Sequence, residues 1–69
     1  MKQEIEKLRA ENDRISAIDK LMADALCELE KAAPTKVTAI VRTKLEEARM
    51  WLERRQAQVR VELARKTCR

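Results

Sequence analysis

Apolar residues recur at helical spacing along both halves of the chain. In the first half, most of their intervals are the threes and fours of a heptad seam, at Ile5, Leu8, Ile15, Met22, Leu26 and Leu29. Ile18, Leu21 and Ala25 widen this stripe on one flank. After a single break at residues 32–35, the spacing resumes at Val37, Ile40, Val41, Leu45, Ala48, Trp51, Leu52, Val59 and Leu63. The pattern predicts two long helices, over about residues 2–32 and 35–66.

The break predicts how the two helices are connected. Pro34 has a fixed φ and no N–H, so we expect it in the connection or in the first turn of the second helix, with Thr35 as the N-cap. The helices are then antiparallel; one unbroken helix kinked at Pro34 is the alternative. The chain is predicted to be one all-α helical-hairpin domain over residues 1–69. Residues 1–14 either continue the seam, with Asn12 fixing its register, or form a charged, solvated extension.

The width of the apolar stripe predicts self-association. Two helices cannot cover stripes that are wider than one seam, so a monomer would leave Ile40, Met50, Trp51 and the flank of the first helix partly exposed. In addition, a chain of 69 residues seldom has a core that contributes more than about 3–5 kcal/mol. We therefore expect a homo-oligomeric helical bundle.

Composition excludes most enzymatic chemistry. The chain has no Gly for a phosphate-binding loop and no His for a catalytic dyad or triad. Cys27 and Cys68 are the only soft metal ligands, and the hairpin places their Cα atoms roughly 40 Å apart, too far for a disulfide. We expect no enzyme activity, metal or cofactor, and free thiols, with Cys27 a small buried hydrophobe. No segment approaches the ~20 apolar residues of a membrane span and no secretory signal opens the chain, which favours the cytoplasm.

Charge is distributed unequally between the two halves. Residues 1–33 hold six Lys/Arg against eight Asp/Glu, whereas residues 34–69 hold ten against four. This excess indicates an anionic partner. The alternative is a solvated helix face with local pairs such as Glu62–Lys66 and Glu46–Arg49. The most suggestive cluster lies near the predicted start of the second helix, where free N–H groups favour anions: Lys36, Arg42, Thr43 and Lys44.

The segment from Arg42 to Leu52, RTKLEEARMWL, resembles the signature of a family of small bacteriophage anti-defence proteins. These proteins are cyclic-oligonucleotide sponges that counter the cyclic-oligonucleotide-based immunity of bacteria (anti-CBASS), and close cousins counter the Thoeris system. The family carries a Thr-Lys-Leu-Glu-Glu-Ala segment ending in Met-Trp on a long helix, after a shorter helix and a Pro-containing connection. The order of elements here is the same, with looser similarity from about Ile15 to Gln58.

The resemblance implies a homo-oligomer, typically a hexamer, that holds its ligand in pockets between protomers without chemistry. The implied ligands are cyclic dinucleotides, cyclic trinucleotides or a cyclic ADP-ribose, and the implied location is the cytoplasm of an infected bacterium. The ligand-facing residues are then Lys36, Arg42, Thr43, Lys44 and Arg49, while Leu45, Ala48 and Trp51 pack. Unlike most of the family, this chain has no Tyr or Phe for base stacking, which leaves Arg side chains, Met22, Met50 or, if it is exposed, Trp51 for base recognition.

Two other classes of protein fit the same residues. One is a dimeric four-helix bundle that binds RNA or DNA through its basic second helix. The other is a coiled-coil scaffold that binds only protein, and the best support for it is Asn12 together with the first heptads. Salt separates the first of these from a sponge, because nucleic-acid binding weakens steeply as counterions are added.

Overall fold

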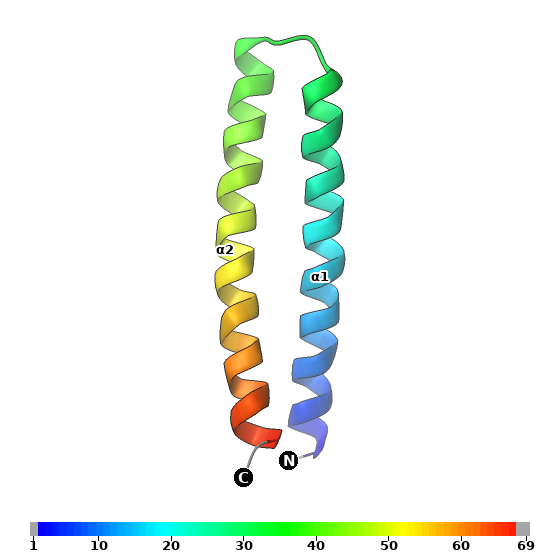
Figure 1. Cartoon of the computed structure of the whole chain (residues 1–69), viewed down its shortest axis with the longest axis vertical. Helices are drawn as coiled ribbons and strands as arrows, with labels where there is room; N and C mark the ends of the chain where they lie inside the picture. The colour runs from blue at the N-terminus through cyan, green and yellow to red at the C-terminus, as the bar shows by residue number, and fades with distance from the viewer. Residues whose placement is uncertain (1, 68–69) are drawn as a thin grey trace.

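The chain folds into a hairpin of two long antiparallel helices (Figure 1). In this computed structural model, which describes residues 2–67, helix α1 spans Lys2–Lys31 and helix α2 spans Lys36–Thr67. The connection lies at one end of a rod 52 Å long, and Lys2 and Thr67 lie at the other. The two-helix prediction is confirmed to within one residue at each helix end, and the unbroken helix kinked at Pro34 is wrong.

A reciprocal pair of threonines begins α2. The Thr38 backbone N–H donates to the Thr35 hydroxyl (3.1 Å), and the Thr35 N–H donates to the Thr38 hydroxyl (2.9 Å). The Ala39 N–H donates to the Thr35 carbonyl (3.0 Å) as the first bond of the helix. This is the geometry of a capping box, with Thr38 in the place that Glu or Gln usually occupies. The prediction of Thr35 as the N-cap, with Pro34 in the connection before it, is therefore confirmed.

The buried core is small and lies away from the connection. Only Leu8, Ile15 and Val59 are buried among the described residues, and Leu52 and Leu63 pack against them. Leu8 and Ile15 are seven residues apart on α1, so they lie on one line of the helix that faces α2. The core therefore joins the first half of α1 to the second half of α2.

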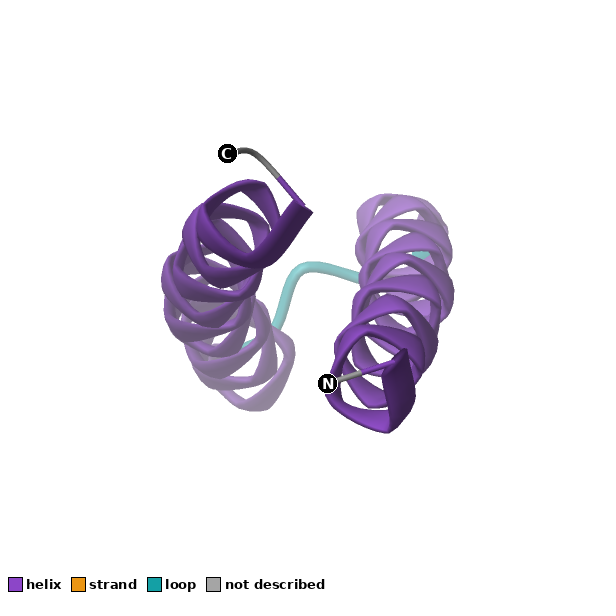
Figure 2. Ribbon diagram, turned by 90° about the horizontal axis from the view of Figure 1, so that it is seen from below, coloured by secondary structure: helices purple, strands orange, loops and turns teal. Residues whose placement is uncertain are grey.

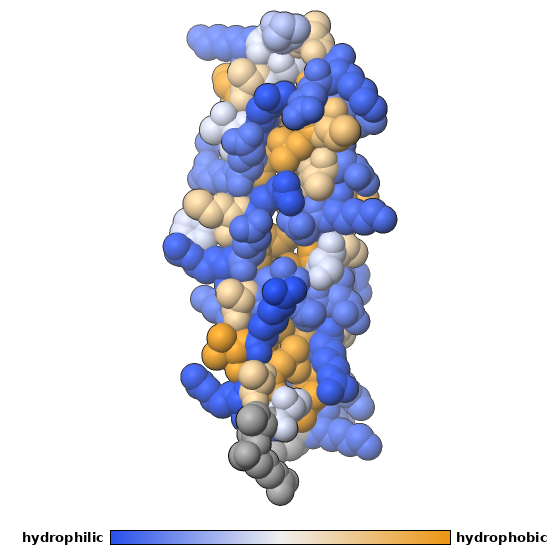
Figure 3. Space-filling model, in the orientation of Figure 1, coloured by the Kyte–Doolittle hydropathy of each residue, from blue (hydrophilic) through white to orange (hydrophobic). Residues whose placement is uncertain are grey.

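Much of the apolar surface has no partner within the hairpin. Large side chains that remain exposed are Ile18, Leu21, Val37, Ile40, Val41, Met50, Trp51 and Val61. Figure 2 shows two helices side by side with nothing covering either outer face, and Figure 3 shows apolar patches between charged side chains. The accessible surface is 5787 Å², against about 4,500 Å² for a compact chain of 8.1 kDa. The exposure expected of a monomer at Ile18, Leu21, Ile40, Met50 and Trp51 is thus confirmed.

Two packing expectations differ from the structure of the single chain. Cys27 is an exposed free thiol, because it follows the seam residue Leu26 and so points about 100° around the helix from it. Ala48 is also exposed, whereas Leu45 is half-buried. Cys68 lies outside the described residues. Neither helix is long and apolar enough to cross a membrane, as judged over residues 2–67.

Candidate functional site

Three cations of α2 are held by acidic residues of α1. Arg49 donates to both carboxylate oxygens of Asp19 (3.0 and 3.3 Å), and Arg55 does the same to Glu11 (2.6 and 2.8 Å). Lys66 Nζ donates to Glu4 (2.5 Å). In each pair the two partners lie at similar distances along the chain from Pro34, as an antiparallel hairpin requires. Lys66 and Arg49 therefore pair across the hairpin and not with the local acids Glu62 and Glu46.

These contacts shift the pKa values of the partners toward their charged forms. The hydrogen bonds donated by Arg55 and Arg49 lower the pKa of Glu11 and of Asp19, against a smaller opposing effect of desolvation. The hydrogen bond and charge of Lys66 lower the pKa of Glu4 in the same way. In return, the carboxylates raise the pKa of Arg49 and Arg55. Part of the charge difference between the two halves of the sequence thus serves to join the helices.

A neutral polar contact lies between two of these ion pairs. The Gln56 side-chain amide donates to the side-chain oxygen Oδ1 of Asn12 (3.3 Å) and to the Ser16 hydroxyl (3.0 Å). Asn12 is half-buried, one turn from the buried Leu8 and Ile15 on either side. Asn12 therefore lies in the seam. Its side-chain amide bonds to Gln56 only when the two residues lie opposite each other, which favours one register of the two helices.

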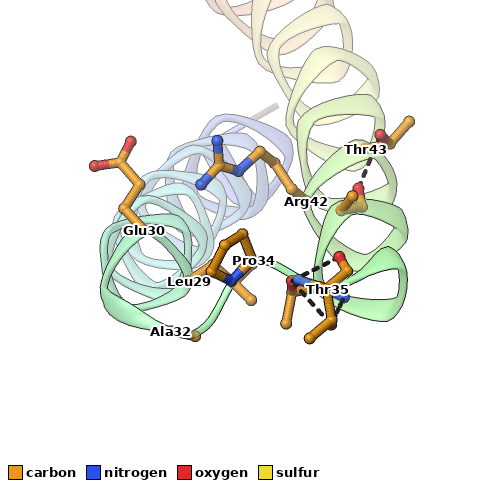
Figure 4. A pocket seen from close by; sticks show the side chains of 9 residues that line it. Leu29, Glu30, Ala32, Pro34, Thr35, Arg42 and Thr43 are labelled. Atoms are coloured by element: carbon orange, nitrogen blue, oxygen red, sulfur yellow. Dashed lines mark hydrogen bonds between the residues drawn. The ribbon is translucent and has the colours of Figure 1, made fainter.

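A pocket of about 390 Å³ opens at the connection, between the ends of the two helices (Figure 4). Arg42 is its only cationic lining residue and extends from α2 above Pro34, while Glu30 stands on the α1 side. The Thr43 hydroxyl donates to the Ala39 carbonyl (3.1 Å), so its proton is already used inside the helix. The lining is thus mixed in charge, since a carboxylate and a guanidinium share one opening.

A second groove, of about 340 Å³, runs along the outer side of the first turns of α2. It is lined by Lys36, Ala39, Ile40, Thr43 and Lys44, all of which belong to α2. Neither Lys36 nor Lys44 has an ion-pair partner in the described part of the chain. Because no acidic residue lines it, this groove is the more favourable of the two for an anion.

The structure brings together four of the five candidate ligand residues and separates the fifth. Lys36, Thr43 and Lys44 share the outer groove, and Arg42 lines the adjoining pocket together with Thr43. Arg49 lies six residues beyond Thr43, about 9 Å along the helix, where Asp19 occupies its guanidinium. The candidate site is therefore the first three turns of α2, from Lys36 to Lys44, without Arg49.

Another surface on α2 was not anticipated from the sequence. Arg54 lies over the ring of Trp51, with Cζ 4.8 Å from the ring centroid, and a groove of about 420 Å³ follows toward Arg65. The sequence does contain a pattern that could have predicted this surface. Intervals of three and four residues alternate along the side of α2 away from Val59, at Trp51, Arg54, Gln58, Val61 and Arg65. Apolar residues thus lie on two sides of α2.

Within residues 2–67, no group of three or more His, Cys, Asp or Glu side chains is arranged to hold a metal ion. Comparison of the chain with protein-family models, with curated proteins and with solved structures found no match. The fold defines a helical hairpin, and any function must be argued from its own residues.

Proposed function

We propose that the protein is a homo-oligomeric sponge that binds cyclic oligonucleotide immune signals and removes them from solution without chemistry. The ligands are cyclic di- or trinucleotides or a related cyclic ADP-ribose, and the place of action is the cytoplasm of an infected bacterium. The observation that carries this proposal is the cluster of Lys36, Arg42 and Lys44 around the start of α2, none of which is used in pairing the helices. The resemblance of the Arg42–Leu52 segment to sponge signatures supplies the ligand class.

The chemistry of the outer groove suits a phosphodiester ring. Lys36 and Lys44 lie eight residues apart, about 12 Å along the helix, and each offers an ammonium group to a phosphate oxygen. The N-terminal end of α2 adds its partial positive charge. Between the lysines, Ile40 is half-exposed and provides an apolar surface for a sugar or base. A groove of about 340 Å³ falls at the lower end of the volumes typical of small-molecule sites.

The groove has only one wall, which supports a site completed by a second protomer. All of its lining residues come from α2, so one chain cannot enclose a ligand. Exposed Val37, Ile40 and Met50 lie on the same helix and supply apolar surface for such a contact. A ligand between protomers would be removed from water on both faces, as sequestration requires. The hexamer implied by the resemblance is our proposal for the assembly.

The nucleic-acid alternative loses part of its basis. It depended on the excess of positive charge on the second helix, but Arg49, Arg55 and Lys66 are neutralised by carboxylates of α1. Fewer free cations mean fewer phosphate contacts and a weaker dependence of binding on salt. The seam position of Asn12 does not favour a protein-only scaffold over the sponge, because its amide pairs the two helices of one chain.

Isothermal titration calorimetry with cyclic dinucleotides and cyclic trinucleotides tests the proposal. We expect Lys44→Ala to weaken binding by at least about tenfold, because it removes a hydrogen bond to a charged phosphate. Arg60→Ala is the matched control, since Arg60 is an exposed α2 cation without an ion-pair partner among residues 2–67, about 24 Å from Lys44. If both variants bind like the wild type, the outer groove is not the site. If no cyclic oligonucleotide binds while a short RNA hairpin does, the sponge is excluded.

A further inference from the structure

A second row of residues on α1 lies outside the hairpin seam. It consists of Arg14, Ile18, Leu21, Ala25 and Glu28, with intervals of four, three, four and three residues. These intervals place all five on one strip of the helix surface. Leu21 is 68% exposed and Ile18 is 39% exposed, although both are large aliphatic residues. The row therefore has the composition of a coiled-coil seam, with an apolar middle and charged ends, but no partner helix in the hairpin.

The row is complementary to itself. Arg14 and Glu28 lie seven residues before and after Leu21, which is close to two helical turns in each direction. When two copies of such a strip pack antiparallel around a two-fold axis at Leu21, Arg14 of each copy faces Glu28 of the other. Ile18 of each copy then lies near Ala25 of the other, so a large side chain meets a small one. A two-fold contact of this kind uses the same surface on both subunits.

The charged residues at the ends of the row are available for this contact. Within residues 2–67, Arg14 has no ion-pair partner, and Glu28 forms an ion pair only with the neighbouring Lys31, at 3.4 Å on an exposed surface. The outer side of α2 is a poorer candidate for pairing with its own copy. That side carries four cations without an ion-pair partner among residues 2–67 (Lys36, Lys44, Arg54 and Arg65) against two acids (Glu47 and Glu62), so a two-fold contact there would hold an excess of positive charge. Repulsion between like charges disfavours that arrangement.

The hairpin surface is large enough for a second copy as the occupant, and the self-complementary charges of the row favour one. The chain exposes about 1,300 Å² more than a compact protein of its mass, and a standard interface covers about 800 Å² on each partner. We propose that the Arg14–Glu28 row of α1 is the two-fold interface of a homodimer, in which two hairpins form a four-helix bundle. This interface involves no residue of the proposed ligand groove, so the two proposals can fail separately. It leaves α2 free for a ligand or for further assembly.

Charge reversal across the two-fold axis tests the interface. Sedimentation equilibrium gives the dimer dissociation constant of the wild type, of Arg14→Glu, of Glu28→Arg and of the double variant. Each single reversal places two like-charged pairs across the axis, and we expect it to raise the dissociation constant by roughly tenfold or more. The double variant restores both pairs with opposite polarity and should return to within about threefold of the wild type. Lys20→Glu, on another side of α1, is the control and should also remain within about threefold.

Disulfide capture gives a second test, which does not depend on electrostatics. In a chain whose Cys27 and Cys68 are replaced by Ser, Leu21→Cys places one thiol beside the two-fold axis. We expect mild oxidation to link two chains through these thiols, and Lys20→Cys to link far more slowly. Circular dichroism confirms that each variant remains helical. The proposal is overturned if the double charge reversal does not restore association, if Leu21→Cys links no faster than Lys20→Cys, or if the wild type is monomeric at ~100 μM.

Discussion

Substitution of Val59 by Ala tests whether the small core holds the hairpin together. Val59 is fully buried and lies with Leu8 and Ile15 in the core. The substitution removes two methyl groups, each contributing about 0.8 kcal/mol by burial, and leaves a cavity that adds up to roughly 1 kcal/mol. We therefore expect the free energy of unfolding to fall by about 2–3 kcal/mol. For a domain of this size, that is a large fraction of the total stability.

The same substitution at Val61 provides a matched control. Val61 lies two residues further along α2, and its side chain is 55% exposed. We expect Val61→Ala to change the free energy of unfolding by less than about 0.5 kcal/mol. The assay is urea denaturation followed by circular dichroism at 222 nm, at one fixed chain concentration because association contributes to apparent stability. Equal losses at Val59 and Val61 would refute the assignment of the core.

Three further outcomes follow from the contacts between and within the helices. Thr35→Ala removes the N-cap of α2 and should lower the free energy of unfolding by about 1 kcal/mol, whereas Thr43→Ala should change it by less than about 0.5 kcal/mol; urea denaturation of both variants decides this. The ion pair with Arg55 lowers the pKa of Glu11 below its ordinary value of 4.5. The contribution of this ion pair to stability is therefore complete above pH 4.5 and is lost as the pH falls through the lowered pKa. Glu11→Gln should therefore flatten the acid limb of a stability–pH curve, and an unchanged limb would contradict the pairing. Asp19→Arg and Arg49→Asp should each lower the thermal unfolding midpoint, and the double variant that combines them should restore it. A double variant as unstable as the single variants would exclude a contact between these two residues.

The fold could be predicted closely from the sequence because local signals agree. The spacing of apolar residues defines both helices, and Pro34 followed by Thr35 marks the single place where the chain reverses. These signals act within a few residues, so they do not depend on how the helices pack. The exposed position of Cys27 was missed since the apolar stripe of α1 is wide, and its edge depends on where α2 lies.

The charged residues were less predictable, because their partners depend on the register of the hairpin. Arg49 has an acidic residue three positions before it, yet it pairs with Asp19 of the other helix. The sequence alone therefore places Arg49 among the ligand residues, although Asp19 occupies its guanidinium. Once the connection is placed at Pro34, the register can be inferred, because residues at similar distances along the chain from Pro34 lie opposite each other. Lys36, Arg42 and Lys44 then remain as the cations near the start of α2 that no α1 carboxylate holds.

Native mass spectrometry of the purified protein with a pool of cyclic di- and trinucleotides and a short RNA hairpin tests the proposed function most directly. We expect an oligomer, with a hexamer as the proposed state, that retains cyclic oligonucleotides in a fixed ratio to protomers. Because no chemistry is proposed, the ligand released on denaturation should have an unchanged mass. An assembly that holds the RNA and ignores every cyclic oligonucleotide, or one that binds neither, would contradict the sponge.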